Sequence, residues 1–340
     1  MSEPVIFGPR IEMMPRDQLK DWQMKLLQPQ LKYVYAHSSF FRKRFDEVGV
    51  KPGDVESWES FERIPVTTAE EIMREAGETG DSYGGLLCKP SDKLTLANTT
   101  LMAKDISVEK KLFFTAFTPD DLRTTANLIS RTFYTMGIRK GDLVQMAMSG
   151  TDSRYITAGV AMDMMGVTRV STCAFMLDAG RAMYIAHFHE PDFLIAPVDF
   201  ALSMANAAEF AGIDPKKAFS SYRAIALTEQ ALGTENTQKL REKGYVGEYF
   251  SMCYTPEACF WAIDCKQHSG IHAPEDLFVV EAVDPKTGKR VKPGEKGNLT
   301  ITSLYAEATP LIRYQTSDTV TITEELCRCG RTTTRITYYN

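Results

Sequence analysis

The sequence predicts an α/β fold in which helices cover both faces of a parallel sheet, followed by a smaller β-rich subdomain. Between residues 118 and 243, helical patterns alternate with short runs of branched apolar residues, which is the order of βαβ units. After Gly244 the pattern changes to β-rich segments separated by turns. With 44% apolar and 24% charged residues, the 340-residue chain has the composition of a globular protein with a sizeable core.

The N-terminal region is predicted to be helical. Apolar residues recur at helical spacing from Arg16 to Phe45, and Pro29 alone interrupts them. A second helical pattern follows Thr68, and Glu71 stands three residues after this threonine. A hydroxyl followed by an acid at this spacing is typical of a capping box at the start of a helix.

The alternating part predicts five helices and four strands. The helices are expected over residues 118–136, 155–165, 180–187, 200–211 and 234–243, and the strands over 143–148, 168–171, 193–196 and 224–227. In the β-rich part, strands are expected over 277–283, 297–303 and 319–323, and residues 336–340 show no terminal element. We therefore expect two domains, residues 1–245 and 246–340.

Charge and cysteine content limit the partners and the compartment. The 39 basic and 44 acidic residues leave a net charge of −5, which predicts no nucleic-acid partner and no anionic membrane surface. No apolar run reaches the roughly 20 residues of a spanning helix, and the N-terminus has no apolar signal segment. Seven cysteines are an odd number in a large chain, so we expect a reducing, cytoplasmic setting and a small-molecule ligand.

Short stretches along the whole chain resemble one enzyme family. The early ones are Tyr35–His37, Phe41–Asp46 and Ile64–Thr68, and the late ones are Gly270–His272, Asp284–Pro285, Gly294–Gly297, Glu307–Tyr314 and Cys327–Thr332. Taken in order, they resemble the phenylacetate-CoA ligase family of adenylate-forming enzymes. The resemblance implies the large N-terminal domain of that fold. It also implies ATP- and Mg²⁺-dependent activation of a small aromatic carboxylic acid through an AMP ester, with transfer to coenzyme A. A monomer and a homodimer both stay open.

The resemblance also implies a set of nucleotide-binding residues. Asp318 matches the acid that accepts from the ribose hydroxyls, although a lone Asp after a loop is ordinarily a turn residue. Glu257 matches the catalytic acid that helps hold magnesium and the phosphates. The remaining nucleotide candidates are Glu229, Tyr254, Thr255, Arg331 and Arg335; a solvated surface arginine is the equal alternative for Arg335.

An apolar acyl pocket is expected near residues 250–261. Tyr254, Phe260 and Trp261 are the aromatic side chains that would stack against a flat acid. Core packing explains each of them equally well.

Two features depart from the family pattern. No glycine occurs between Gly85 and Gly137, so the glycine-rich phosphate loop of the family has no counterpart. The residues left to offer donors are Asn98, Thr99, Thr100 and Lys104. The chain also ends where the family's small domain with its catalytic lysine would begin. The alternative function is therefore a degenerate homologue that binds an aromatic acid without adenylating it.

Four residues predict a metal centre. Cys265 and His272 precede the pair Cys327 and Cys329, and three thiolates with one imidazole suit tetrahedral zinc in a closed structural site. A zinc is sometimes held at this place in related ligases. A disulfide or unrelated core thiols are the alternatives, and His268 is the alternative fourth ligand.

Overall fold

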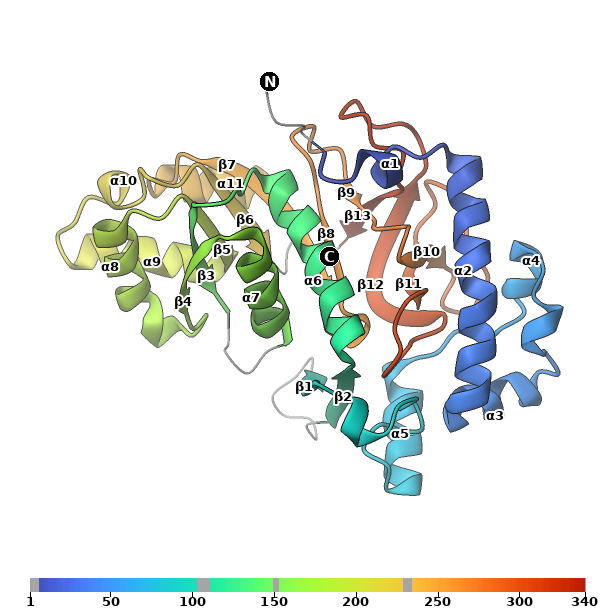
Figure 1. The fold of residues 1–340 in the computed structure, drawn as a ribbon. Helices are drawn as coiled ribbons and strands as arrows, with labels where there is room; N and C mark the ends of the chain where they lie inside the picture. Colours follow the sequence, from blue (N-terminus) through green and yellow to red (C-terminus); the bar gives the residue numbers. More distant parts are fainter. Residues whose placement is uncertain (1–5, 103–110, 149–152, 229–233, 340) are drawn as a thin grey trace. The chain divides into compact units, whose positions relative to one another are not determined.

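The computed structural model describes residues 6–102, 111–148, 153–228 and 234–339 (Figure 1). The chain divides into two compact units, each built from separate stretches of sequence. Unit 1 comprises residues 1–8, 126–254 and 261–272, and unit 2 comprises residues 9–125, 255–260 and 273–340. The division predicted near residue 245 does not coincide with this one, because the N-terminal helices share a unit with the late β-strands. Within the described residues, no helix is long and apolar enough to span a membrane.

Unit 1 contains a sheet whose strands follow the order β9-β8-β7-β6-β5-β3-β4. Strands β3 to β7 run parallel to their neighbours, whereas β8 and β9 pair antiparallel. The strands are β3 (Leu143–Ala147), β4 (Thr168–Thr172), β5 (Phe193–Pro197), β6 (Ala224–Thr228), β7 (Glu248–Thr255), β8 (Phe260–Ile263) and β9 (Ile271–His272). The predicted βαβ alternation is confirmed.

Helices precede and connect these parallel strands. They are α6 (Pro119–Met136), α7 (Ser153–Met165), the short η3 (Met176–Asp178), α8 (Ala179–His189), α9 (Val198–Phe210), α10 (Pro215–Ala218) and α11 (Thr234–Glu242). Small apolar residues of α8 and α9 pack with the strands into one buried cluster. The cluster also satisfies a polar group: Tyr222 donates to Gln145 at 2.5 Å, and Gln145 donates to the carbonyl of Ala182 at 2.8 Å.

Unit 2 combines the N-terminal helices with antiparallel strands. Its helical elements are α1 (Pro9–Glu12), α2 (Arg16–His37), α3 (Ser39–Glu47), η1 (Pro52–Asp54), α4 (Trp58–Phe61), α5 (Ala69–Thr79), η2 (Ser91–Lys93) and η4 (Pro256–Ala258). Its strands are β1 (Leu96–Met102), β2 (Lys111–Phe117), β10 (Phe278–Val283), β11 (Gly297–Ser303), β12 (Tyr314–Thr323) and β13 (Arg335–Tyr339). Strands β10 to β13 form an antiparallel meander, and β1 pairs with β2 separately.

The helix start predicted at Thr68 is confirmed as a capping box. The amide of Glu71 donates to Thr68 Oγ1 at 3.3 Å, and the amide of Thr68 donates to Glu71 Oε2 at 2.9 Å. The N-terminal helical region is divided at Ser38, whose hydroxyl accepts from the amide of Phe41 and so begins α3. Pro29 lies inside α2 without ending it.

The expectation of no terminal element was wrong. Residues 335–339 form β13, which pairs with β12 from Thr323 to Thr319. Their backbone groups find partners in β12, a strand that is longer than the predicted 319–323. This pairing is a long-range feature, and no local pattern in residues 336–340 predicts it.

A buried arginine fixes the start of β12. Arg313 has a positive φ of 47° and is fully buried. Its guanidinium donates to both carboxylate oxygens of Glu281 at 3.2 and 3.3 Å and to the carbonyls of Glu62 and Ile64 at 3.0 and 2.6 Å. These charge-assisted bonds tie the segment before α5 and strand β10 to the residue from which β12 departs.

Candidate active site and metal centre

Asp318 lies on an irregularity in β12. Thr319 pairs with Asn298 and Gln315 pairs with Thr300, so residues 316–318 of β12 stand opposite Leu299 alone. A β-bulge redirects side chains and is common beside active sites. Asp318 is exposed there, and its Oδ2 accepts from Thr316 Oγ1 at 3.3 Å while its amide donates back to this oxygen at 3.1 Å. The carboxylate is thus oriented by the bulge itself.

Glu257 lies on the short helix η4, directly after β7. The side chain is 7% exposed. Burial, and to a smaller degree the negative charge of Asp318, raises the pKa of Glu257 to about 7. Burial at the start of β12, and to a smaller degree the charges of Glu257, Glu70 and Asp318, raise the pKa of Tyr314. Glu257 is therefore within reach of the negative charge of Asp318, and a cation beside the two carboxylates would relieve their repulsion.

The β1–β2 hairpin separates the two threonines that the sequence proposed as donors. Thr99 is exposed, whereas Thr100 is half-buried on the opposite face with Asn98, as the alternation of a strand requires. Thr100 lies opposite Phe113, whose ring meets that of Tyr314 at 6.1 Å. Thr100, but not Thr99, is therefore on the face that packs toward the start of β12.

Asn98 is another residue that the sequence offered as a donor, whereas Thr115 on the same hairpin was not predicted; Lys104, the remaining sequence candidate, lies outside the described residues. Asn98 and Thr115 lie directly opposite each other in the register. Among the described residues, neither Asn98 Nδ2 nor Thr115 Oγ1 has a hydrogen-bond partner although both atoms are buried. Unpaired buried polar atoms are uncommon in folded proteins. The inner face of the hairpin thus offers partners to a polar ligand, and only the strand register reveals it.

Tyr254 and Thr255 end strand β7. Thr255 is buried and Tyr254 is half-buried. The hydroxyl of Tyr254 is 2.7 Å from Ser153 Oγ, at the first residue of α7. Ser153 was not predicted from the sequence, because its contact depends on the sheet order.

The two remaining aromatic candidates belong to different environments. Phe260 is fully buried and its ring meets that of Phe278 edge-on at 5.2 Å. Trp261 is 1% exposed and packs between the rings of Phe133 and Tyr254, at 6.3 and 4.8 Å. Phe260 is thus a core residue in this structure, whereas Trp261 supports the half-buried ring of Tyr254.

The two arginines near the end of the chain are held by protein groups. Arg331 is 2% exposed, and its Nε donates to Glu12 at 2.5 Å. Arg335 is the first residue of β13, and its Nη2 donates to the carbonyl of Glu325 at 3.3 Å. The structure thus gives Arg331 a buried ion pair, which does not require a nucleotide. Glu229, the other nucleotide candidate, lies outside the described residues.

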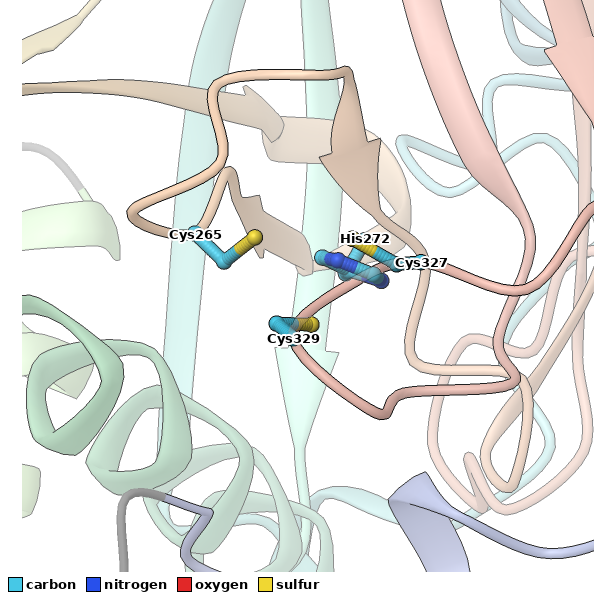
Figure 2. A group of neighbouring side chains, drawn as sticks. All are labelled: Cys265, His272, Cys327 and Cys329. Carbon is cyan, nitrogen blue, oxygen red and sulfur yellow. The ribbon is translucent and has the colours of Figure 1, made fainter.

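The four predicted metal ligands lie together (Figure 2). The ligand atoms of Cys265, His272, Cys327 and Cys329 are all within 4.8 Å of one another. In tetrahedral zinc sites, metal–ligand distances of about 2.0–2.3 Å place ligand atoms roughly 3.5–4 Å apart. Three of the four residues are buried, so the donors, the spacing and the burial fit a closed structural zinc site.

Backbone turns hold the thiols of this group. The amide of Gln267 donates to Cys265 Sγ at 3.5 Å. After Cys327, Gly330 adopts a positive φ of 92° and donates its amide to the carbonyl of Cys327 at 2.9 Å. The alternative ligand His268 is outside the group: its Nδ1 is 2.8 Å from Asp264 Oδ2.

Comparison with solved structures shows the fold class of the chain. Crystal structures of 2-hydroxyisobutyryl-CoA ligase match the chain. One in complex with 2-HIB-AMP and CoA has a TM-score of 0.88 at 21% identity, covering 99% of this chain and 77% of that one. Another, in the thioesterification state, has a TM-score of 0.89 at 22% identity, covering 98% and 70%. The chain therefore has the fold of adenylate-forming CoA ligases.

Comparison of the sequence identifies the particular relatives. No family model matches the chain. The phenylacetate-coenzyme A ligase of Thermus thermophilus is 26% identical over 98% of this chain and 72% of its own length. Those of Pseudomonas putida and Aromatoleum evansii are 26% and 24% identical over 89% and 96% of this chain, and over 66% and 72% of their own lengths. The predicted resemblance to phenylacetate-CoA ligases is confirmed.

Proposed function

We propose that this protein is an adenylate-forming acid–thiol ligase that activates a small aromatic carboxylic acid with ATP and transfers it to coenzyme A. The observation that carries the proposal is the buried Glu257 on η4, whose pKa is raised in part by the charge of Asp318 on the bulge of β12. This arrangement occurs in a chain whose relatives are named phenylacetate-coenzyme A ligases.

The two reaction steps assign a role to each carboxylate. In the first step, a carboxylate oxygen of the acid attacks the α-phosphorus of ATP, and the bond to pyrophosphate breaks. In the second, the thiolate of coenzyme A attacks the acyl carbon and AMP leaves. Asp318, exposed and held by Thr316, accepts hydrogen bonds from the ribose hydroxyls.

Glu257 is suited to hold Mg²⁺. Carboxylate oxygens are the protein ligands that this cation prefers, and burial beside Asp318 makes a neighbouring cation favourable. When bound, the cation neutralises phosphate charge that develops during phosphoryl transfer. The side chain of Thr100, on the inner face of the β1–β2 hairpin, donates to phosphate oxygens.

We assign the binding of the acyl part of the substrate to the aromatic ring of Tyr254. The ring of Trp261 packs against it, with 4.8 Å between the ring centroids. Flat rings stack favourably in an offset or tilted arrangement. The test is pyrophosphate release with Mg²⁺-ATP and a panel of aromatic acids. Release that depends on the acid supports the proposal, whereas acid binding without ATP binding would favour the degenerate homologue.

We also propose a structural zinc at Cys265, His272, Cys327 and Cys329. The closed set of one imidazole and three thiols leaves no ligand position for a substrate, so the metal stabilises the fold and has no part in the reaction. None of the cysteines forms a disulfide, which is in keeping with the reducing, cytoplasmic setting that we propose for the chain. Metal analysis of the purified protein tests the site, and a zinc content far below one per chain would refute it. The homodimer stays a prediction that light scattering checks.

A further inference from the structure

Helix α8 is apolar on two opposite faces. Its inner face is buried in the core of unit 1 and consists of Ala179, Ala182, Met183 and Ala186. On its outer face, Tyr184 and Phe188 are exposed, and their rings stack at 6.0 Å. Leu177, on the short η3 that leads into α8, is 100% exposed. A helix that is apolar all round is typical of one that is buried on all sides, so we expect a further surface to cover the outer face.

Another helix of unit 1 shows what a face in contact with water contains. Leu240 of α11 is buried. The exposed residues of this helix that the structure describes are charged or carry an amide, namely Glu235, Gln238, Lys239, Arg241 and Glu242. In α8, by contrast, Arg181 is the only Lys, Arg, Asp or Glu of the helix. The outer face of α8 is therefore unlike the solvated helix surface found elsewhere in the same unit.

The exposed apolar side chains around α8 supply much of the area that a stable interface needs. Phe175, Leu177, Tyr184 and Phe188 all lie within 14 residues, and Phe175 and Phe188 are 65% and 71% exposed. The four present roughly 500 Å² of largely apolar surface, if a fully exposed side chain of this size offers about 200 Å². Stable protein interfaces cover about 800 Å² on each partner. The patch thus reaches more than half of this area.

Four residues of this face form a stripe that is complementary to itself. Leu177, Arg181, Tyr184 and Phe188, here called the outer stripe, are spaced by four, three and four residues, which keeps them on one side of a helix. The spacing is the same when it is counted from either end. If two copies meet with their α8 helices antiparallel, Leu177 faces Phe188 of the partner subunit and Arg181 faces Tyr184 of the partner subunit. This is the symmetry of a two-fold interface.

The charge of Arg181 does not oppose such a contact. Its Nε and Nη2 donate to the two carboxylate oxygens of Asp178, each at 2.7 Å. The ion pair neutralises the guanidinium within the same chain, and the flat face of the group is left to stack on an aromatic ring. Two outer stripes can therefore pack together without burying an uncompensated charge.

We propose that two copies of this chain associate through their α8 helices, arranged antiparallel so that each outer stripe covers the other. The self-complementary spacing favours a second copy over a different protein, because a different partner would not require it. The proposal concerns the assembly of the protein and is independent of the reaction proposed above.

Sedimentation of the full chain over a range of concentrations tests the proposal. The wild type should form a dimer, and Phe188→Glu should raise the dissociation constant of the dimer about 100-fold or more, because it places a charge at the centre of the apolar contact in both copies. Val246→Glu is the matched control. Val246 is 67% exposed and precedes β7, which lies at the opposite end of the parallel strands from β4, so this variant should dimerise like the wild type. Circular dichroism checks that both variants are folded.

Cross-linking tests the antiparallel direction. Leu177→Cys and Phe188→Cys are prepared separately, mixed and mildly oxidised. Residue 177 of one copy should lie beside residue 188 of the other, so the mixture should form an intermolecular disulfide. Within either variant alone, the two introduced thiols would be about 16 Å apart along the helices. Neither variant alone should therefore cross-link more than the wild type, which controls for the native cysteines.

Three results would overturn the proposal. The wild type may be monomeric at every concentration, which would leave the outer stripe to a different protein. Phe188→Glu and Val246→Glu may weaken the dimer equally, which would mean that the copies meet elsewhere. The cross-link may form within one cysteine variant as readily as in the mixture, which would mean that the helices are not antiparallel in the inferred register.

Discussion

The buried carboxyl group of Glu257 senses the exposed carboxylate of Asp318. The two residues come from η4 and from the bulge of β12, and the charge of Asp318 contributes to a pKa of about 7 at Glu257. Burial is the larger cause. A glutamic acid with this pKa is half-protonated at neutral pH. A cation bound beside it would favour the ionised form and lower the pKa.

The first prediction concerns pH and stability. In the absence of divalent cations, Glu257 keeps its proton in the folded state up to about pH 7, whereas in the unfolded chain it loses the proton near its ordinary pKa of 4.5. The folded state therefore loses stability as the pH rises from about 4.5 to 7, by about 1–3 kcal/mol from this group. Glu257→Gln should remove this loss. Urea unfolding of both proteins at pH 5 and pH 8, with a chelator, measures this loss. If the unfolding free energy changes equally between the two pH values in both proteins, the raised pKa of Glu257 is contradicted.

The second prediction concerns Asp318. Replacing it with Asn should weaken Mg²⁺-ATP binding about 10- to 100-fold, because hydrogen bonds to a charged acceptor are lost. The thermal midpoint should change little, since the side chain is exposed. Calorimetric titration with ATP measures the effect. Glu78→Gln, an exposed acid on α5, is the control, and an equal loss in that variant would argue against a specific role.

The third prediction separates Thr99 from Thr100. Only Thr100 lies on the inner face of the β1–β2 hairpin, so Thr100→Val should lower ATP affinity about 3- to 10-fold by removing a hydroxyl. Thr99→Val should leave the affinity unchanged, which makes it a matched control in the neighbouring position. The same titration reads both variants. If the exposed threonine has the larger effect, the hairpin presents its other face to the nucleotide.

The fourth prediction concerns the metal centre. Cys327→Ser should reduce the zinc content well below one per chain and lower the thermal midpoint, because binding energy of a structural zinc is folding energy. Cys173→Ser changes a half-buried cysteine outside the cluster and should retain the metal. Elemental analysis and thermal melting of both variants decide; unchanged zinc in Cys327→Ser would exclude this ligand.

The fifth prediction concerns the buried arginine at the start of β12. Arg313→Met leaves Glu281 buried without its partner, which should cost about 3–5 kcal/mol of unfolding free energy. The double variant Arg313→Met with Glu281→Leu should recover part of this loss, because the uncompensated charge is gone. Urea unfolding measures both.

The control is Arg123→Met, since Arg123 pairs with Asp120 on the surface and such exposed pairs contribute about 0–1 kcal/mol. A similar loss in both single variants would mean that the buried charge is not the cause.

Local patterns predicted the elements that local physics controls. The parallel strands carry continuous apolar runs, as in β6, whose five residues are all buried, because both faces are covered. The capping box at Thr68 is likewise a contact between neighbours in sequence. By contrast, β13 exists only because β12 offers backbone partners. Strand pairing over such a distance leaves little trace in composition.

The same distinction holds for the candidate site. The donor set of the metal centre, Cys265, His272, Cys327 and Cys329, was predicted by residue type and resemblance, and the structure gathers those atoms within 4.8 Å. The contact of Ser153 with Tyr254 was not predicted, because it depends on the order in which the strands lie.

The amino-acid sequence by itself determined the α/β class, the approximate helix starts and which acids, thiols and imidazole are candidates for the site and the metal centre, since these follow from side-chain type and short spacing. Tertiary structure alone decided which threonine of the β1–β2 hairpin faces inward, that Arg331 is used by Glu12, and that Glu257 titrates near neutrality. The reason is that burial and the nearness of a distant charge are properties of the packed chain, and neither is encoded in any one stretch of it.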